Sequence, residues 1–280
     1  MRNETAQNGV AKYYSRVGSR LGYKLVMKDS QHFGYYNDAH DSERTAQQKY
    51  HEEFSKLLDL KPGMNVLDAG CGQGVVACYL AKHKDVHVTG ITIVPYEVKS
   101  AQQRALKQNV QTQTRFLLAD YATPPLEPQS FDRIYTTETL SHALDVKKVL
   151  EVFMTLLKPG GKLICAEYEF DYDKFGERGN EYAKFVKRYA AINAMYEFGV
   201  GQFVSNLKVT GFKEVKTIDW TPQVTPSFKR LARLARPLVP IIKKLHLEKY
   251  FVNTIAANSY AWYREHDAIF YKIYTAVKKV

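Results

Sequence analysis

The feature that most constrains the fold of this chain is a short apolar run that ends in closely spaced glycines. Residues 66–74 read Val-Leu-Asp-Ala-Gly-Cys-Gly-Gln-Gly. The pattern predicts a buried strand, a tight turn and a helix over 75–83, because glycine lets the backbone pass close beneath a ligand where a side chain would collide. The N-terminal amides of that helix would point at the same place. We therefore expect a ligand site at this turn.

Further strands and helices alternate along the chain, which predicts a mostly parallel sheet with right-handed crossovers. The expected strands cover 65–68, 87–91, 114–118, 131–135, 162–168, 214–219 and 268–277. The helices that frame the core are expected over 7–27, 43–60, 96–108, 146–157, 180–198 and 202–210, and a helical insertion broken by prolines over 227–264. Extra helices of this kind should cover the carboxyl ends of the strands, where open α/β sheets bind ligands.

The spacing Asp-x-Gly-x-Gly-x-Gly at 68–74 resembles the first motif of the class I S-adenosylmethionine-dependent methyltransferases. Two later segments, Gly-Ile-Thr at 90–92 and Glu-Thr-Leu-Ser-His-Ala at 138–143, are similar to the sterol and tocopherol C-methyltransferase branch. Val94 and Glu97 depart from that branch, which usually has a polar residue and glutamine there. The resemblance implies an α/β fold: a Rossmann-like, seven-stranded, mostly parallel sheet with helices on both faces and an added helical cap.

This resemblance divides the chain into three parts. Residues 1–60 would form an N-terminal helical cap and entry helix, and 61–170 the S-adenosylmethionine-binding core. Residues 171–280 would complete the sheet and carry an inserted substrate cap at about 171–200 and 226–264.

The cofactor implied by the resemblance is S-adenosylmethionine, which leaves as S-adenosylhomocysteine. Its contacts are assigned to Asp68, Gly70, Cys71, Gly72, Gly74, Thr92, Ile93, Asp120, Tyr121 and Thr137. Thr92 stands where most class I enzymes carry an acid that accepts hydrogen bonds from the ribose hydroxyls. Asp120 would accept from the adenine amino group, and Tyr121 would cover the ring.

The catalytic residues are expected to be Glu138 and His142. They are four residues apart, so on a helix both would share one face, directed at the methyl group. If the acceptor is an alkene carbon, its attack leaves a carbocation that a carboxylate can stabilise and a base must deprotonate. We assign these tasks to Glu138, with His142 orienting it or relaying the proton.

The substrate pocket is expected to include Tyr13, Tyr14, His32, Tyr35, Tyr36 and, after the fifth strand, Glu167. The acceptor is predicted to be a sterol, terpenoid or prenyl-type alkene. Alternatives are O- or N-methylation of an aromatic or alkaloid natural product, methyl or cyclopropane transfer to a fatty acyl chain, and a cofactor-binding membrane scaffold without activity. The motifs of nucleic-acid methyltransferases are absent, so no nucleic-acid partner is expected.

Charge is unevenly distributed: the chain has a formal net charge of +11, and most of this excess lies after residue 220. Residues 227–245 combine apolar and basic side chains in the manner of an amphipathic helix, which predicts binding to an anionic membrane surface. The sequence shows no apolar run of about 18 residues and no signal peptide at its start. Cys71, Cys78 and Cys165 are expected to be free thiols, which favours a cytoplasmic location. No metal is expected, and self-association is left open.

Overall fold

The computed structural model describes residues 2–15, 32–38 and 40–279. Its centre is a seven-stranded sheet with the order β3-β2-β1-β4-β5-β7-β6. The strands are β1 (Asn65–Ala69), β2 (His87–Thr92), β3 (Thr114–Leu118), β4 (Phe131–Thr137), β5 (Leu157–Phe170), β6 (Lys213–Asp219) and β7 (Ile269–Val277). Strands β1 to β5 pair in parallel, whereas β7 runs antiparallel to both β5 and β6. The predicted fold class is confirmed.

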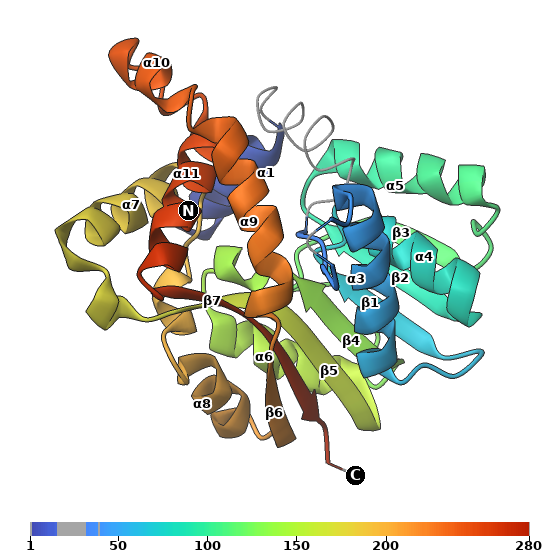
Figure 1. The fold of residues 1–280 in the computed structure, drawn as a ribbon. Coiled ribbons are helices and arrows are strands. Elements are labelled where there is room, and N and C mark those ends of the chain that lie inside the picture. Colours follow the sequence, from blue (N-terminus) through green and yellow to red (C-terminus); the bar gives the residue numbers. More distant parts are fainter. Residues whose placement is uncertain (1, 16–31, 39, 280) are drawn as a thin grey trace.

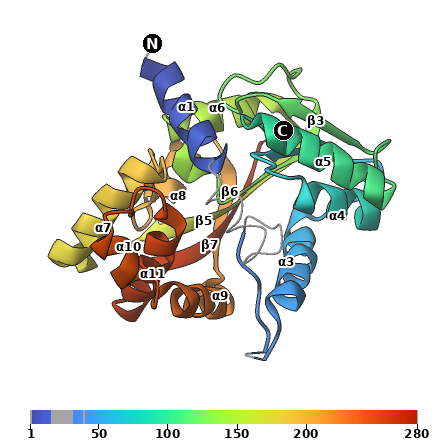
Figure 2. The same cartoon turned by 90° about the horizontal axis from the view of Figure 1, so that it is seen from above.

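Helices cover both faces of this sheet (Figures 1 and 2). One face carries α3 (Glu43–Leu58), α4 (Val75–Lys84) and α5 (Pro95–Gln108), and the other carries α6 (Val146–Leu156) and α8 (Gln202–Val209). Helix α6 shows why such segments form: Asp145 caps its first turn by accepting from the amide of Lys148. Its buried side chains, Val149, Leu150 and Phe153, recur at helical spacing and pack toward β5.

The cap lies above the sheet in Figure 1. It consists of α1 (Arg2–Ser15), α7 (Gly176–Tyr189), α9 (Thr221–Ala235), α10 (Val239–Lys244) and α11 (Val252–Glu265). Helix α11 packs against α9 and α7, and the hydroxyl of Tyr263 donates to the carbonyl of Gly179 at 2.7 Å. A hydrogen bond from Tyr13 to Asn253 attaches α1 to α11. Every helix among the described residues is too short or too polar to cross a bilayer.

Three helix predictions need correction. The helix expected over 180–198 ends at Tyr189, because Ala191 has a left-handed φ of 54°; the chain resumes as a 3₁₀ turn, η3 (Met195–Phe198). The insertion at 227–264 is three helices, and the first begins at Thr221. The helix expected over 7–27 begins at Arg2 and reaches Ser15, and residues 16–31 lie outside the described residues.

Candidate active site

The turn between β1 and α4 requires glycine for steric reasons. Gly70 has a φ of +91°, and a Cβ built there would lie 2.3 Å from Oγ1 of Thr139. Gly74 has a φ of +70°, and a Cβ there would lie 2.8 Å from the Cβ of Ala101. The amides of Gly70 and Cys71 both donate to the carbonyl of Ile91 at 2.9 Å. The turn is therefore held against the end of β2, with no room for side chains on its inner side.

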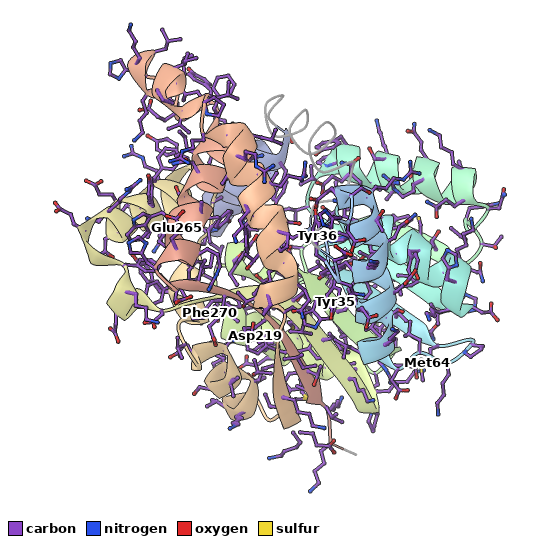
Figure 3. The ribbon with its side chains drawn as sticks, viewed as in Figure 1. Tyr35, Tyr36, Met64, Asp219, Glu265 and Phe270 are labelled. Atoms are coloured by element: carbon purple, nitrogen blue, oxygen red, sulfur yellow. The ribbon has the colours of Figure 1, made fainter. Side chains whose placement is uncertain are left out.

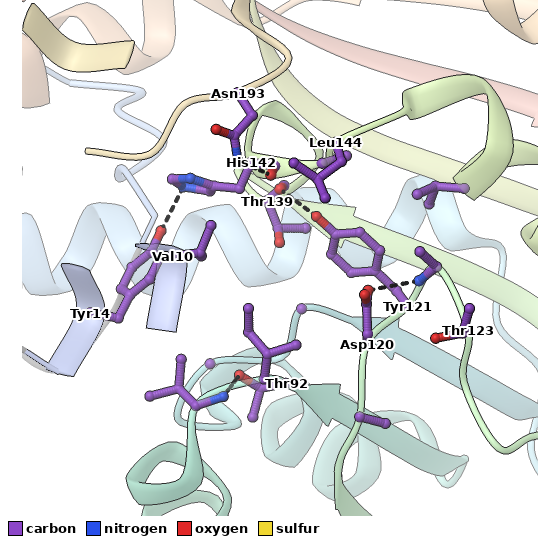
Figure 4. Close-up of a pocket in the computed structure, with 18 of the residues that line it drawn as sticks. Val10, Tyr14, Thr92, Asp120, Tyr121, Thr123, Thr139, His142, Leu144 and Asn193 are labelled. Atoms are coloured by element: carbon purple, nitrogen blue, oxygen red, sulfur yellow. Dashed lines mark hydrogen bonds between the residues drawn. The ribbon is translucent and has the colours of Figure 1, made fainter. Parts of the chain in front are cut away.

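A cavity of about 460 Å³ lies beside this turn, at the carboxyl ends of β1 to β4 (Figure 4). Val10 and Tyr14 of α1 form part of its wall, and so do Glu138 and His142. Seven of the ten predicted cofactor residues line it, namely Gly70, Gly72, Thr92, Ile93, Asp120, Tyr121 and Thr137. Its volume suits a single ligand of cofactor size.

The other three predicted cofactor residues lie behind the turn. Asp68 and Cys71 line a separate pocket of about 40 Å³, together with His32, and Gly74 packs against Phe116. Burial raises the pKa of Asp68 to about 7. Gly70 and Thr137 line both pockets, and cofactor contact by Asp68, Cys71 and Gly74 stays a prediction.

Glu138 directly follows the last residue of β4 and lines the cavity. Its φ of 54° is a strained value for a residue with a side chain. One carboxyl oxygen accepts from the amide of Phe33 at 3.1 Å and from the hydroxyl of Tyr271 at 2.9 Å. The other accepts from the hydroxyl of Tyr168 at 2.8 Å. Burial raises the pKa of Glu138 to about 7, so this carboxyl gains or loses its proton near neutrality.

His142 ends a single 3₁₀ turn, η1 (Leu140–His142). Its Nδ1 lies 3.0 Å from the carbonyl of Ala191, and its Nε2 lies 2.9 Å from the hydroxyl of Tyr14. Because a carbonyl can only accept, Nδ1 carries the proton and Nε2 accepts from Tyr14. Burial lowers the pKa of His142, so the ring is neutral. The break after α7 explains this geometry, since it brings Ala191 and Asn193 against His142.

Glu138 and His142 do not share a helical face as expected, because Glu138 lies before the 3₁₀ turn. The bend at Glu138 nevertheless brings both side chains to the same cavity. Tyr14 joins them there from α1 (Figure 4).

Glu167 lies behind this segment instead of in the cavity wall. One of its oxygens accepts from the amides of Thr139 and Leu140 at 2.7 and 2.6 Å. The other oxygen has no hydrogen-bond partner among the described residues. Burial, with a smaller contribution from Glu138, raises the pKa of Glu167 to about 8. It therefore acts as a neutral anchor for the loop that carries Glu138 and His142.

The remaining predicted pocket residues have separate places. Tyr13 is buried beside Tyr14, with ring centroids 4.9 Å apart. His32 accepts from His51 at 3.0 Å and donates to the carbonyl of its neighbour. Tyr35 packs on Trp220, and the hydroxyl of Tyr36 donates to Glu43. Figure 3 shows both tyrosines between α3 and α9. Neither is among the residues that line the cavity, and their contact with substrate stays a prediction.

A family model for a methyltransferase domain matches residues 60–218. The chain is also 31% identical to the S-adenosyl-L-methionine-dependent Diels-Alderase iccD of Talaromyces variabilis over 267 residues, which cover 91% of this chain and 90% of that protein. The chain belongs to the S-adenosylmethionine-dependent methyltransferases. The predicted enzyme class and cofactor are thereby confirmed, and the sterol and tocopherol branch stays a prediction.

Two solved structures share the fold of this methyltransferase over almost its full length. The [4+2]-cyclase SpnF superposes with a TM-score of 0.77 at 22% identity, covering 98% of this chain and 97% of that one. A geranyl diphosphate methyltransferase solved with geranyl diphosphate and sinefungin gives 0.73 at 18% identity, covering 98% and 99%.

The cavity of this methyltransferase contains a buried acid that the sequence motifs do not indicate. Glu97 lines the cavity, is 2% exposed, and accepts from Oγ1 of Thr92 at 2.7 Å. Thr92 occupies the place of the acid found in most class I enzymes, so Glu97 returns a carboxylate to the ribose site from five residues further on. The signal in the sequence was an acid where the resembled branch usually has glutamine.

These residues fit S-adenosylmethionine. Gly70 and Gly72 would hold its methionine part, and Thr92 with Glu97 would hold the ribose hydroxyls. The adenine would lie against Tyr121, whose hydroxyl is fixed on the carbonyl of Thr139 at 3.1 Å. Asp120, which accepts from the amide of Ala122 at 2.8 Å, would meet the adenine edge.

The role of Glu97 can be tested by cofactor binding. We expect Glu97→Ala to raise the Kd for S-adenosylhomocysteine by about 10- to 100-fold, because a hydrogen bond to a charged group is worth about 1.5–3 kcal/mol. Glu97→Gln should lose less, since its amide oxygen still accepts. Isothermal titration calorimetry gives both values, with the exposed Glu127→Ala as control. Equal Kd values for Glu97→Ala and the control would show that Glu97 does not bind the cofactor.

The anchoring role of Glu167 predicts a pH-dependent difference in stability. Because folding raises the pKa of Glu167, its stabilising contribution is complete at pH values below its pKa in the unfolded chain. This contribution is lost as the pH rises through about 8. The glutamine of the Glu167→Gln variant keeps an acceptor but cannot ionise. The free energy of unfolding of this variant should therefore fall less than that of the wild type between about pH 6 and 9. Urea unfolding measures both. Parallel pH profiles would contradict the assignment.

Proposed function

We propose that this methyltransferase methylates an apolar small molecule at an electron-rich carbon, with a prenyl- or sterol-type alkene as the acceptor. The observation that carries this proposal is the position of Glu138, a residue that lines the cofactor cavity and whose carboxyl is held by the hydroxyls of Tyr168 and Tyr271. Bound S-adenosylmethionine supplies an electrophilic methyl group on a positively charged sulfur. The task of the protein is then to hold the alkene in line and to manage the cation that forms.

Glu138 is suited to that task by charge and by pKa. When the alkene carbon bonds to the methyl group, the methyl–sulfur bond breaks and the neighbouring carbon becomes cationic. The carboxylate of Glu138 can stabilise that charge at short range in a site with little water. It can then accept the proton that the cation loses as the double bond forms again. A base with a pKa of about 7 is matched to proton transfer at neutral pH.

Aromatic rings lie behind the carboxyl of Glu138. We call this group the aromatic cluster: Phe33, Tyr168, Phe228, Tyr260 and Tyr271. The rings of Tyr168 and Tyr260 are stacked with their centroids 5.6 Å apart, and the ring centroids of Phe33 and Phe228 are 4.5 Å apart. Aromatic faces attract cations, so the cluster favours a cationic intermediate and excludes the water that would quench it.

A second candidate function is S-adenosylmethionine-dependent [4+2] cyclisation of a polyene. It is favoured by one observation, namely that the similarity to the Diels-Alderase iccD spans 91% of this chain and so includes the cap as well as the core. In this reaction no methyl group moves. The hydroxyl of Tyr14, which donates to Nε2 of His142 at the cavity wall, would exchange that hydrogen bond for one to a carbonyl on the dienophile and activate it.

The two functions differ in the mass of the product. Purified protein is incubated with S-adenosylmethionine that carries a trideuterated methyl group and with lipid extracts, geranyl diphosphate or a linear polyene. We expect a labelled product with the methyl group on carbon, detected by mass spectrometry and located by fragmentation. Label on oxygen or nitrogen would contradict the carbocation mechanism. An unlabelled isomer of the substrate would instead support cyclisation.

Glu138 predicts the pH dependence of the methylation. Its carboxyl must be ionised to act, so kcat/KM should rise with pH around about 7. Glu138→Gln should lower kcat by about 10²- to 10⁴-fold, the usual contribution of a general base, with the Kd for S-adenosylhomocysteine unchanged. The control is Glu169→Gln, a buried glutamate of β5 that accepts from Tyr274 outside the cavity. Full activity in Glu138→Gln would disprove the role.

A further inference from the structure

One part of the cap extends away from the rest of the molecule and exposes apolar side chains. It runs over residues 234–251, from the end of α9 through α10 to the start of α11, and we call it the tip (Figure 1). Six of the twelve large apolar side chains that are exposed in the described part of the chain belong to it: Leu234, Leu238, Ile241, Leu245, Tyr250 and Phe251. Their exposed fractions run from 44% to 58%. Such a concentration is typical of a binding surface.

Cations accompany these apolar side chains. The tip contains Arg236, Lys243, Lys244 and Lys249 against the single acid Glu248, and Arg233 lies directly before it. All five cationic residues are exposed. The surface of the tip is therefore both apolar and positively charged.

The tip is not the whole amphipathic segment expected at 227–245. Phe228 is buried in the aromatic cluster, and Leu231 is partly buried against the same core. Arg230 bonds to the buried carboxylate of Glu43 at 2.7 Å. The first part of that segment therefore faces the protein, and the outward surface begins near Leu234.

We propose that the tip docks on an anionic lipid surface. Leucine, isoleucine and aromatic side chains can enter the boundary between headgroups and acyl chains, while flanking lysine and arginine bind anionic headgroups. A second copy of the chain is disfavoured, because two surfaces with this charge would repel each other. A nucleic acid would attract the cations, but contact with its phosphates would leave the six apolar side chains in water.

Docking would bring the substrate pocket close to the bilayer. Helices α9 and α11 flank the tip and carry Phe228 and Tyr260 of the aromatic cluster near their middles. Helix α9 runs for seven residues beyond Phe228 before it ends at Ala235, or about 10 Å of helix. The delivery of an apolar acceptor along this route rests on the proposed function, whereas docking itself does not.

Vesicle binding tests the charge of the tip. We expect the protein to sediment with phosphatidylcholine vesicles that contain about 30% phosphatidylserine, and much less with phosphatidylcholine alone, in a salt-dependent manner. The triple variant Arg236→Glu, Lys243→Glu, Lys244→Glu should bind at least about 100-fold more weakly, at about fivefold per cation. The control is the triple variant Lys82→Glu, Lys99→Glu, Lys107→Glu, whose substitutions lie on α4 and α5. It changes the net charge of the protein by the same amount and should retain most of the binding.

A second pair of variants tests the apolar side chains. Leu238→Ser, Ile241→Ser should weaken vesicle binding by about tenfold or more, whereas Leu106→Ser, Val209→Ser, with equally exposed residues elsewhere, should not. Unchanged affinity for S-adenosylhomocysteine shows that each variant is folded. The proposal is overturned if the wild type ignores anionic vesicles, or if the control variants lose binding equally. Concentration-dependent dimers that disappear in the tip variants would assign the surface to a second copy.

Discussion

The organisation of this site depends on the buried carboxyl group of Glu138, which joins the core sheet to the segment ahead of it. Its hydrogen bonds reach Phe33 in the loop before α3, Tyr168 on β5 and Tyr271 on β7. A carboxylate that is removed from water is costly unless such donors replace the lost hydration. These donors hold the bent backbone at residue 138 and fix the N-terminal loop over the ends of the strands.

A second buried acid, Glu167, lies close to Glu138, and the two carboxyls have different roles. Glu138 directly follows β4, and Glu167 lies within the adjacent parallel strand β5. Burial raises the pKa of both carboxyls. Glu138 belongs to the cavity lining and Glu167 does not, and the charge of Glu138 contributes to the raised pKa of Glu167. A negative charge on Glu138 thus disfavours ionisation of Glu167. The environment thus separates two similar carboxyls into a base and an anchor.

The sequence was sufficient for the parts of the fold that local patterns determine. Apolar runs marked the strands to within a few residues, and the glycines at 70–74 located the turn. The sequence could not show that Tyr271 bonds to Glu138 across 133 positions, because such pairing depends on how β7 inserts beside β5. Nor could periodicity show the break at Ala191, which is stabilised by its contact with His142. Tertiary contacts overrode the helical preference there.

The same limit explains the basic segment of the cap. From composition alone, Arg230 and Arg236 are both expected on the surface that binds the membrane. In the structure, Arg230 forms an ion pair with buried Glu43, whereas Arg236 is exposed. Only the packing of α9 against α11 decides which face of the helix meets water. An amphipathic pattern identifies a helix with two faces, but the partner of each face is a property of the folded chain.

Two kinds of contact join the cap to the rest of the molecule, and they differ in what it costs to open them. At the cavity wall, the hydroxyl of Tyr14 on α1 meets His142 through a hydrogen bond. Such a bond contributes only about 0.5–1.5 kcal/mol net, because water replaces it when it opens. Helices α9 and α11 instead pack Phe228 and Tyr260 into the aromatic cluster, where separation would cost about 25 cal/mol for each Å² of apolar surface exposed. The polar contact can therefore be exchanged for a ligand at small cost, while the apolar packing keeps α9 and α11 in place.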